Sequence, residues 1–195
     1  MFYEPPNSAE LEEIKELNLL FLIYLRLSVR GGGDCLGLPA GSVTRLRELS
    51  SASLEGVSAF PRALFDLDLK NMPVTREHLI FCRTALEQSR RALTLTILHS
   101  AWNMSHKRDF QARAFLRLSA VTTRRLRTTA ISELPLLAAT PGLLSCAFPG
   151  ARSLWATLLD RAETEMPRAL KMIALHPDTE ILSARHPMSL SQLPS

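Results

Sequence analysis

Basic side chains that could bind nucleic acid are concentrated in one part of this 195-residue chain. Residues 83–127 contain ten lysines and arginines against two acidic residues, which is a formal charge of +8, whereas the whole chain carries +4. Such a stretch can attract phosphate backbones, because each neutralised phosphate releases bound counterions. It can equally form a solvated helix surface or bind an acidic protein, so composition alone leaves three interpretations open.

Other residues that could do chemistry are few and scattered. Cys35, Cys82 and Cys146 lie far apart with no CxxC spacing, so we expect neither a disulfide framework nor a zinc ribbon, and we favour a reducing cytoplasm. The five histidines show no metal-ligand spacing, and the eight glycines form no phosphate-binding loop. Asp66 and Asp68 give no case for paired-carboxylate catalysis. We therefore expect no catalytic residue, metal site or cofactor, and a protein that is not an enzyme.

The first apolar run is too short to cross a membrane. Residues 17–25 form a run of nine, which is about half of what a membrane-spanning helix requires, and Arg26 follows it directly. The residues before it carry no basic segment of the kind that begins a signal peptide. We expect a cytoplasmic protein that does not bind membranes.

Apolar residues recur at helical spacing through most of the chain, which predicts an all-α fold. Gly31-Gly32-Gly33 ends the first helix, because each glycine inside a helix costs roughly 1 kcal/mol. A short extended segment is expected at 64–69, and periodicity is lost after Pro177. The expected helices cover residues 8–28, 42–49, 53–59, 79–104, 109–118, 122–129, 132–139 and, interrupted by Pro167, 151–173.

A shift of 80 residues aligns two parts of the chain. Residues 36–64 and 116–144 share ten identical residues in a gapless alignment, among them the Arg-Leu-Arg of 45–47 and 125–127. Each part follows a long apolar helix, so the repeated unit would be a long helix, a linker and two short helices that end at a proline. Two such units would act as a covalently joined dimer. Two unrelated helical segments with similar leucine spacing are the alternative.

Both parts also resemble a known family. The first has Asn18-Leu19 in an apolar helix, then Leu36-Gly37-Leu38, then Leu49-Ser50 at the start of the next helix, and in these motifs it is similar to FlhD. The second resembles FlhD through residues 115–118, 131–132 and 143–148. FlhD proteins are subunits of a bacterial transcriptional activator of flagellar genes. The likeness covers about 50 mostly hydrophobic residues in each half of the chain.

This chain departs from the family in two ways. FlhD proteins are single units of roughly half its length, and Ser119 stands where the second unit should have a glycine. The resemblance implies tandem FlhD-like units at 8–72 and 73–148, followed by a helical segment at 149–177 and a flexible tail at 178–195. It also implies an oligomeric transcription regulator that binds double-stranded promoter DNA together with an FlhC-like partner subunit.

If the resemblance holds, helices 42–49 and 122–129 begin two elements similar to a helix-turn-helix. Arginine forms paired contacts with phosphates and with guanine edges, and the second helix lies in the basic stretch, so we expect the second unit to supply more of the DNA contact. The expected DNA-binding residues are Arg45, Arg47, Lys107, Arg108, Arg113, Arg117, Arg124, Arg125 and Arg127.

Two alternatives remain at this point. The chain could be an FlhD-like adaptor or anti-activator whose basic stretch meets an acidic protein and never DNA, and the acidic first helix could dock on that stretch. Cys146 occupies a position where the family often has a cysteine, which suggests an inter-subunit disulfide. A buried thiol in a reducing compartment is the simpler interpretation.

Overall fold

The computed structural model describes residues 8–69 and 84–160, which are mainly helical. This confirms the all-α class. The helices are α1 (Ser8–Arg30), α2 (Ala40–Glu48), α3 (Ser51–Ser58), α4 (Ala85–Lys107), α5 (Asp109–Phe115), α6 (Ala120–Thr128), the 3₁₀ helix η2 (Ile131–Glu133), α7 (Leu134–Ala138) and α8 (Arg152–Asp160). The strands β1 (Phe65–Leu67) and β2 (Leu144–Cys146) pair antiparallel. The sequence predicted the first strand and missed the second.

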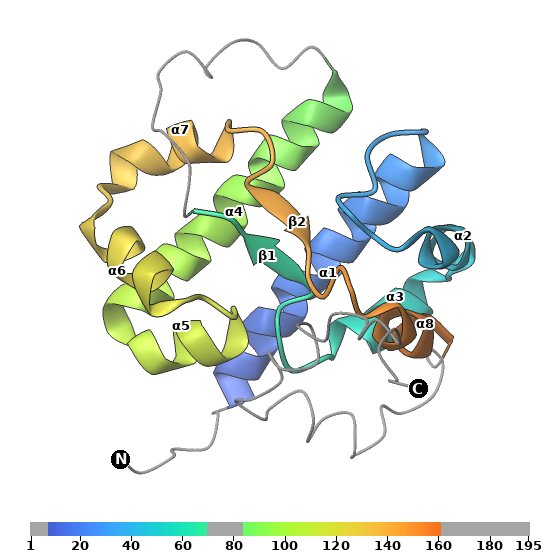
Figure 1. Cartoon of the computed structure of the whole chain (residues 1–195), viewed down its shortest axis with the longest axis horizontal. Helices are drawn as coiled ribbons and strands as arrows, with labels where there is room; N and C mark the ends of the chain where they lie inside the picture. The colour runs from blue at the N-terminus through green and yellow to red at the C-terminus, as the bar shows by residue number, and fades with distance from the viewer. Residues whose placement is uncertain (1–7, 70–83, 161–195) are drawn as a thin grey trace, which may run out of the picture.

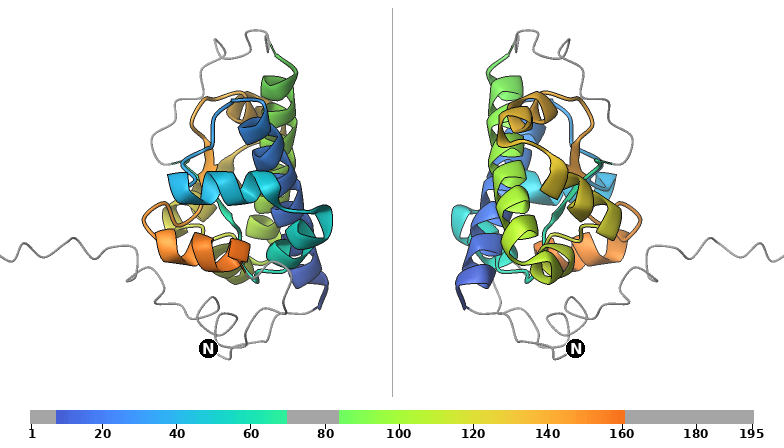
Figure 2. Two further views of the ribbon diagram at one scale, coloured as in Figure 1. Left: turned by 90° about the vertical axis from the view of Figure 1, so that its right-hand side faces the viewer. Right: turned by 90° about the vertical axis from the view of Figure 1, so that its left-hand side faces the viewer.

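The two long helices form one side of the molecule. Figure 2 shows α1 and α4 next to each other along one edge, with the sheet, α2, α6 and α8 on the other side. Buried apolar residues from every helix except the 3₁₀ helix, and from both strands, form one continuous cluster. The two expected units therefore share a single hydrophobic core, and the boundary expected between residues 72 and 73 lies outside the described residues. None of the helices within the described ranges is long and apolar enough to cross a membrane.

Side-chain caps explain where several helices begin. Ser50 and Ser119 accept hydrogen bonds from the backbone N–H groups of residues 53 and 122, three positions on. The starts expected at residues 53 and 122 were thus two residues late. The start expected at Ser42 was also two residues late, and α2 follows Pro39 without a side-chain cap. Thr84 and Glu87 form a reciprocal capping box at the start of α4, and the part of that helix expected before residue 84 lies outside the described residues.

The same elements recur in the same order. The ranges of α2 and α3, 40–48 and 51–58, become those of α6 and of η2 with α7 when 80 is added. For the long helices the matching offset is 76: residues 16–30 and 92–106 have the same burial class at 14 of 15 positions. The connection after the long helix is therefore four residues longer in the second half, and it contains α5.

The two halves face each other across the sheet. Phe65 pairs with Cys146 and Asp66 pairs with Ser145. When 80 is added, Phe65 corresponds to Ser145 and Asp66 corresponds to Cys146, so each of these two residues of β1 pairs with the counterpart of the other. A two-fold axis between the halves produces this pattern. In Figure 1, α2 and α3 lie on one side of the strands, and α6 and α7 lie on the other side.

One buried amide holds the connection between α3 and β1. Asn18 on α1 has no exposed surface. Its Nδ2 donates to the carbonyl oxygens of Ser58, Phe60 and Arg62 at 3.2, 3.1 and 2.9 Å, and its Oδ1 accepts from the N–H of Leu64 at 2.8 Å. Four backbone groups that are shielded from water are thereby satisfied by one side chain.

We expect Asn18→Ala to lower the free energy of unfolding by at least about 3 kcal/mol, because several buried backbone groups lose their partner. Asn18→Asp should be worse at neutral pH, since it keeps an acceptor for Leu64 but turns a carboxylate toward three carbonyl oxygens. Urea denaturation followed by circular dichroism measures both changes.

The control is Asn103→Ala on the exposed face of α4, which should change the unfolding free energy by no more than about 0.5 kcal/mol. Equal effects of the two alanine substitutions would show that the Asn18 amide does not organise this connection.

Candidate nucleic-acid interface

The two candidate arginines of α2 both contact other parts of the chain. Arg45 forms an ion pair with Asp160 of α8 at 2.6 Å, with both side chains about half exposed. Arg47 donates to the carbonyl oxygen of Val29 at 3.1 Å, near the end of α1. In return, Arg30 donates to the carbonyl oxygen of Arg47. Arg47 and Arg30 donate to carbonyl groups in the last turns of α1 and α2, where carbonyl groups have no partner within the helix. The two side chains thereby join α1 to α2.

Three candidates of the second half also contact other parts of the chain: Arg108, Arg117 and Arg125. Arg108 forms an ion pair with the buried Glu10 of α1. Arg125 donates to the carbonyl oxygen of Leu69. Glu10 of the acidic first helix thus pairs with the basic stretch inside the same chain, whereas the adaptor hypothesis had this helix dock so that the chain self-associates.

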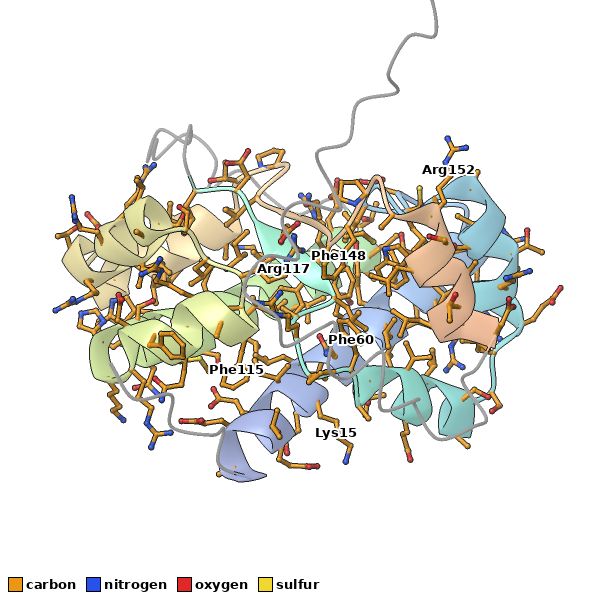
Figure 3. All side chains as sticks on the ribbon, turned by 60° about the horizontal axis from the view of Figure 1, so that its bottom comes forward. Lys15, Phe60, Phe115, Arg117, Phe148 and Arg152 are labelled. Carbon is orange, nitrogen blue, oxygen red and sulfur yellow. The ribbon has the colours of Figure 1, made fainter. Side chains whose placement is uncertain are left out.

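Arg117 lies in the middle of the molecule beside the sheet (Figure 3). It forms an ion pair with Asp66 at 3.1 Å, and its guanidinium lies 3.9 Å from the centre of the Phe148 ring. Its φ is +56°, where the corresponding Gly37 has +81°. The glycine-like position of the second half is therefore Arg117 and not Ser119. Its left-handed backbone costs roughly 1 kcal/mol, which the contacts with Asp66 and Phe148 offset.

The other four candidates point into solvent. Lys107 ends α4, Arg113 lies on α5, and Arg124 and Arg127 lie three residues apart on the outer face of α6; all four are exposed. Their side chains form no ion pair with any other residue of the described ranges. Both α5 and α6 pack on α4, at the same end of the molecule (Figure 1). We call Lys107, Arg113, Arg124 and Arg127 the basic surface.

Exposed apolar residues that the sequence analysis did not single out lie on α5, α6 and the 3₁₀ helix η2. Val121 precedes Arg124 by three residues and is 67% exposed, and Phe110 and Ile131 are about half exposed. Methyl groups beside arginines can contact thymine methyl groups in a DNA groove. The spacing of residues 121, 124 and 127 indicates one helix face, but Val121 belongs to it only if α6 begins at Ala120 and not at residue 122, where the sequence analysis placed its start.

The matching positions of the first half are exposed but carry fewer cations. Helix α8 packs on α2 and α3, and its Asp160 neutralises Arg45. The counterparts of Val121, Arg124 and Arg127 are Gly41, Thr44 and Arg47. At these positions the first half therefore presents fewer cations than the second.

The second helix of each short pair carries no base. The sequence of α3 is SASLEGVS and that of α7 is LPLLA, with Leu134 and Leu137 buried. In a DNA-binding helix-turn-helix this second helix enters the major groove with polar side chains. The second helices of the two pairs therefore offer no base for a contact with DNA, and the exposed arginines of the second pair lie on its first helix, α6.

Cysteines and histidines form no reactive site in the described residues. Cys146 is buried, and its Sγ donates to the carbonyl oxygen of Cys35 at 3.6 Å. Burial raises the pKa of the Cys146 thiol far above its ordinary value, which disfavours the reactive thiolate. His106 stacks on Trp102 with ring centres 4.1 Å apart. Within the described ranges, no three His, Cys, Asp or Glu side chains are placed to hold a metal ion.

Comparison of the chain with protein-family models, with curated proteins and with solved structures finds no match.

We expect Arg117→Gln to raise the pKa of Asp66. Burial already raises that pKa above its ordinary value of 3.8, and the charge of Arg117 lowers it in part, so removing the charge leaves the desolvation unopposed. A carboxyl whose pKa is higher when folded contributes stability at low pH and loses it as the pH rises from 3.8 through its folded pKa. Carbon-detected NMR titration of the aspartate carboxyls measures the change.

Arg113→Gln is the control, because Arg113 is exposed on α5 and should leave the Asp66 titration unchanged. An Asp66 pKa that is the same in Arg117→Gln and in the unsubstituted protein would contradict the role given to this ion pair.

Proposed function

We propose that the chain is a bacterial transcription regulator that binds double-stranded DNA through the basic surface of α4, α5 and α6. One observation carries the proposal: the four exposed cations of α4, α5 and α6 form no ion pair within the described residues, whereas Arg45 and Arg47 of the helix that corresponds to α6 contact Asp160 and Val29. The resemblance to FlhD supports regulation at promoters as the setting.

The chemistry of the basic surface favours phosphate contacts. Lys107 and Arg113 lie on α4 and α5, next to the exposed line of α6, so several cations from different elements can follow one DNA backbone. Neither short pair offers a second helix with a basic side chain for reading bases. We therefore propose that the chain alone binds DNA with strong salt dependence and little sequence preference, and that an FlhC-like partner supplies most of the base recognition.

An acidic protein could use the same surface, as the adaptor alternative requires. The two functions differ in their response to DNA, since an adaptor would bind no duplex with or without a partner. A gel shift with the promoter region next to the gene, with and without a co-encoded partner, separates them, and the absence of a shift under every condition would contradict our proposal.

We expect Arg124→Gln/Arg127→Gln to weaken duplex binding and to lower the slope of log affinity against log salt by about 2, because each lost phosphate contact removes about one released counterion. Fluorescence anisotropy of a labelled duplex across a salt series measures the slope.

The matched control is Arg45→Gln/Arg47→Gln on the corresponding helix α2. It removes the same net charge, but from side chains that contact Asp160 and Val29, and it should leave the slope unchanged. An equal fall in both double variants would mean that only the total charge matters, and it would contradict an interface on α6.

A further inference from the structure

Three apolar side chains on α1 are exposed to solvent on one line. Leu20, Ile23 and Leu27 are 46%, 36% and 55% exposed. Their spacing of three and four residues places them on one face of the helix, next to one another. We call Leu20, Ile23 and Leu27 the α1 stripe. It belongs to α1, which runs beside α4 along one edge of the molecule (Figure 2).

The fold itself does not require apolar residues at these positions. At the offset of 76 that relates the long helices, the α1 stripe corresponds to Thr96, His99 and Asn103, which are also exposed. All three are polar. The same structural positions are thus compatible with water-facing side chains on α4, and only α1 carries an apolar contact surface there.

Opposite charges lie at the two ends of the α1 stripe. Glu16 and Arg30 are exposed on the same line, each seven residues from Ile23. With a rise of 1.5 Å per residue, each lies about 10 Å from Ile23 along the helix axis. The line therefore has an acid at one end, a base at the other and leucines between them, with Ile23 at its centre.

We propose that α1 packs antiparallel on α1 of a second copy of this chain, with Ile23 on the two-fold axis. A helix turned end to end about Ile23 brings Glu16 of one copy next to Arg30 of the other, twice. Leu20 of one copy then lies beside Leu27 of its partner. This self-complementarity is what an isologous interface requires, and it argues for a second copy over an unrelated apolar partner.

The α1 stripe is small compared with stable interfaces, which bury about 1,200 Å² or more. The dimer should therefore be weak, form at high protein concentration and weaken with added salt, because its exposed ion pairs are screened. Each dimer would hold four repeated halves. Self-association does not depend on DNA binding, so it is measured without DNA, and its failure would leave the proposed function untouched.

Charge reversal tests the antiparallel arrangement. Glu16→Arg alone and Arg30→Glu alone each place like charges at both ends of the interface, so each variant should stay monomeric in sedimentation equilibrium at concentrations where the unsubstituted protein is dimeric. An equimolar mixture of the two variants restores two opposite-charge pairs and should regain the mass of a dimer. Circular dichroism verifies that both variants fold, since Arg30 also contacts α2.

Leu27→Lys tests the apolar contact, with Asn103→Lys on the corresponding position of α4 as its matched control. We expect Leu27→Lys to abolish the dimer and Asn103→Lys to leave it intact. The proposal is overturned if the unsubstituted protein keeps the mass of one chain at all concentrations, or if Asn103→Lys dissociates a dimer as well as Leu27→Lys does. It is also overturned if the mixed charge variants fail to associate.

Discussion

The arrangement of the two halves depends on the hydrogen bonds of one buried side chain. Asn18 holds the chain between α3 and β1 by satisfying four backbone groups that no water reaches. This connection sets the position of β1, which pairs with β2 of the other half. Asp66 on β1 in turn receives Arg117 from the second half. A buried polar group is favourable only when its partners are in place, so it also specifies which register the strands adopt.

The two halves share a plan but have different surfaces. The carbonyl group of Leu49 accepts from Arg26, and that of its counterpart Thr129 accepts from Trp102, which lies 76 residues after Arg26. Asn18 has no such equivalent, because Thr94 bonds within its own helix. Helix α8 packs on the first half, whose α1 also carries the apolar stripe, whereas α6 of the second half carries exposed arginines. Corresponding positions of the two halves therefore differ in their surface side chains, while the pattern of buried positions along the two long helices is nearly the same.

Periodicity and local spacing predicted much of the fold. The glycine run after α1, the helix pairs, the strand near Phe65 and the offset of 80 are all local or repetitive signals. Strand β2 was missed because Leu144–Cys146 becomes extended through pairing with a segment far away in the chain. The partners of Arg108 and Arg125 were missed for the same reason, since Glu10 and Leu69 lie distant in sequence. The side-chain type shows that a residue is a cation. Only the tertiary fold shows whether that arginine contacts another part of the chain or is exposed to solvent.

We propose that α6 faces DNA and that the similar helix α2 does not. Hydrogen exchange measured by mass spectrometry, with and without a saturating duplex at low salt, tests it most directly. Because the exposed cations of α6 form no ion pair within the described residues, whereas Arg45 and Arg47 of α2 contact Asp160 and Val29, we expect slower exchange in residues 107–128 and no change in residues 40–48. Equal protection of both helices, or protection of α2 alone, would contradict the claim.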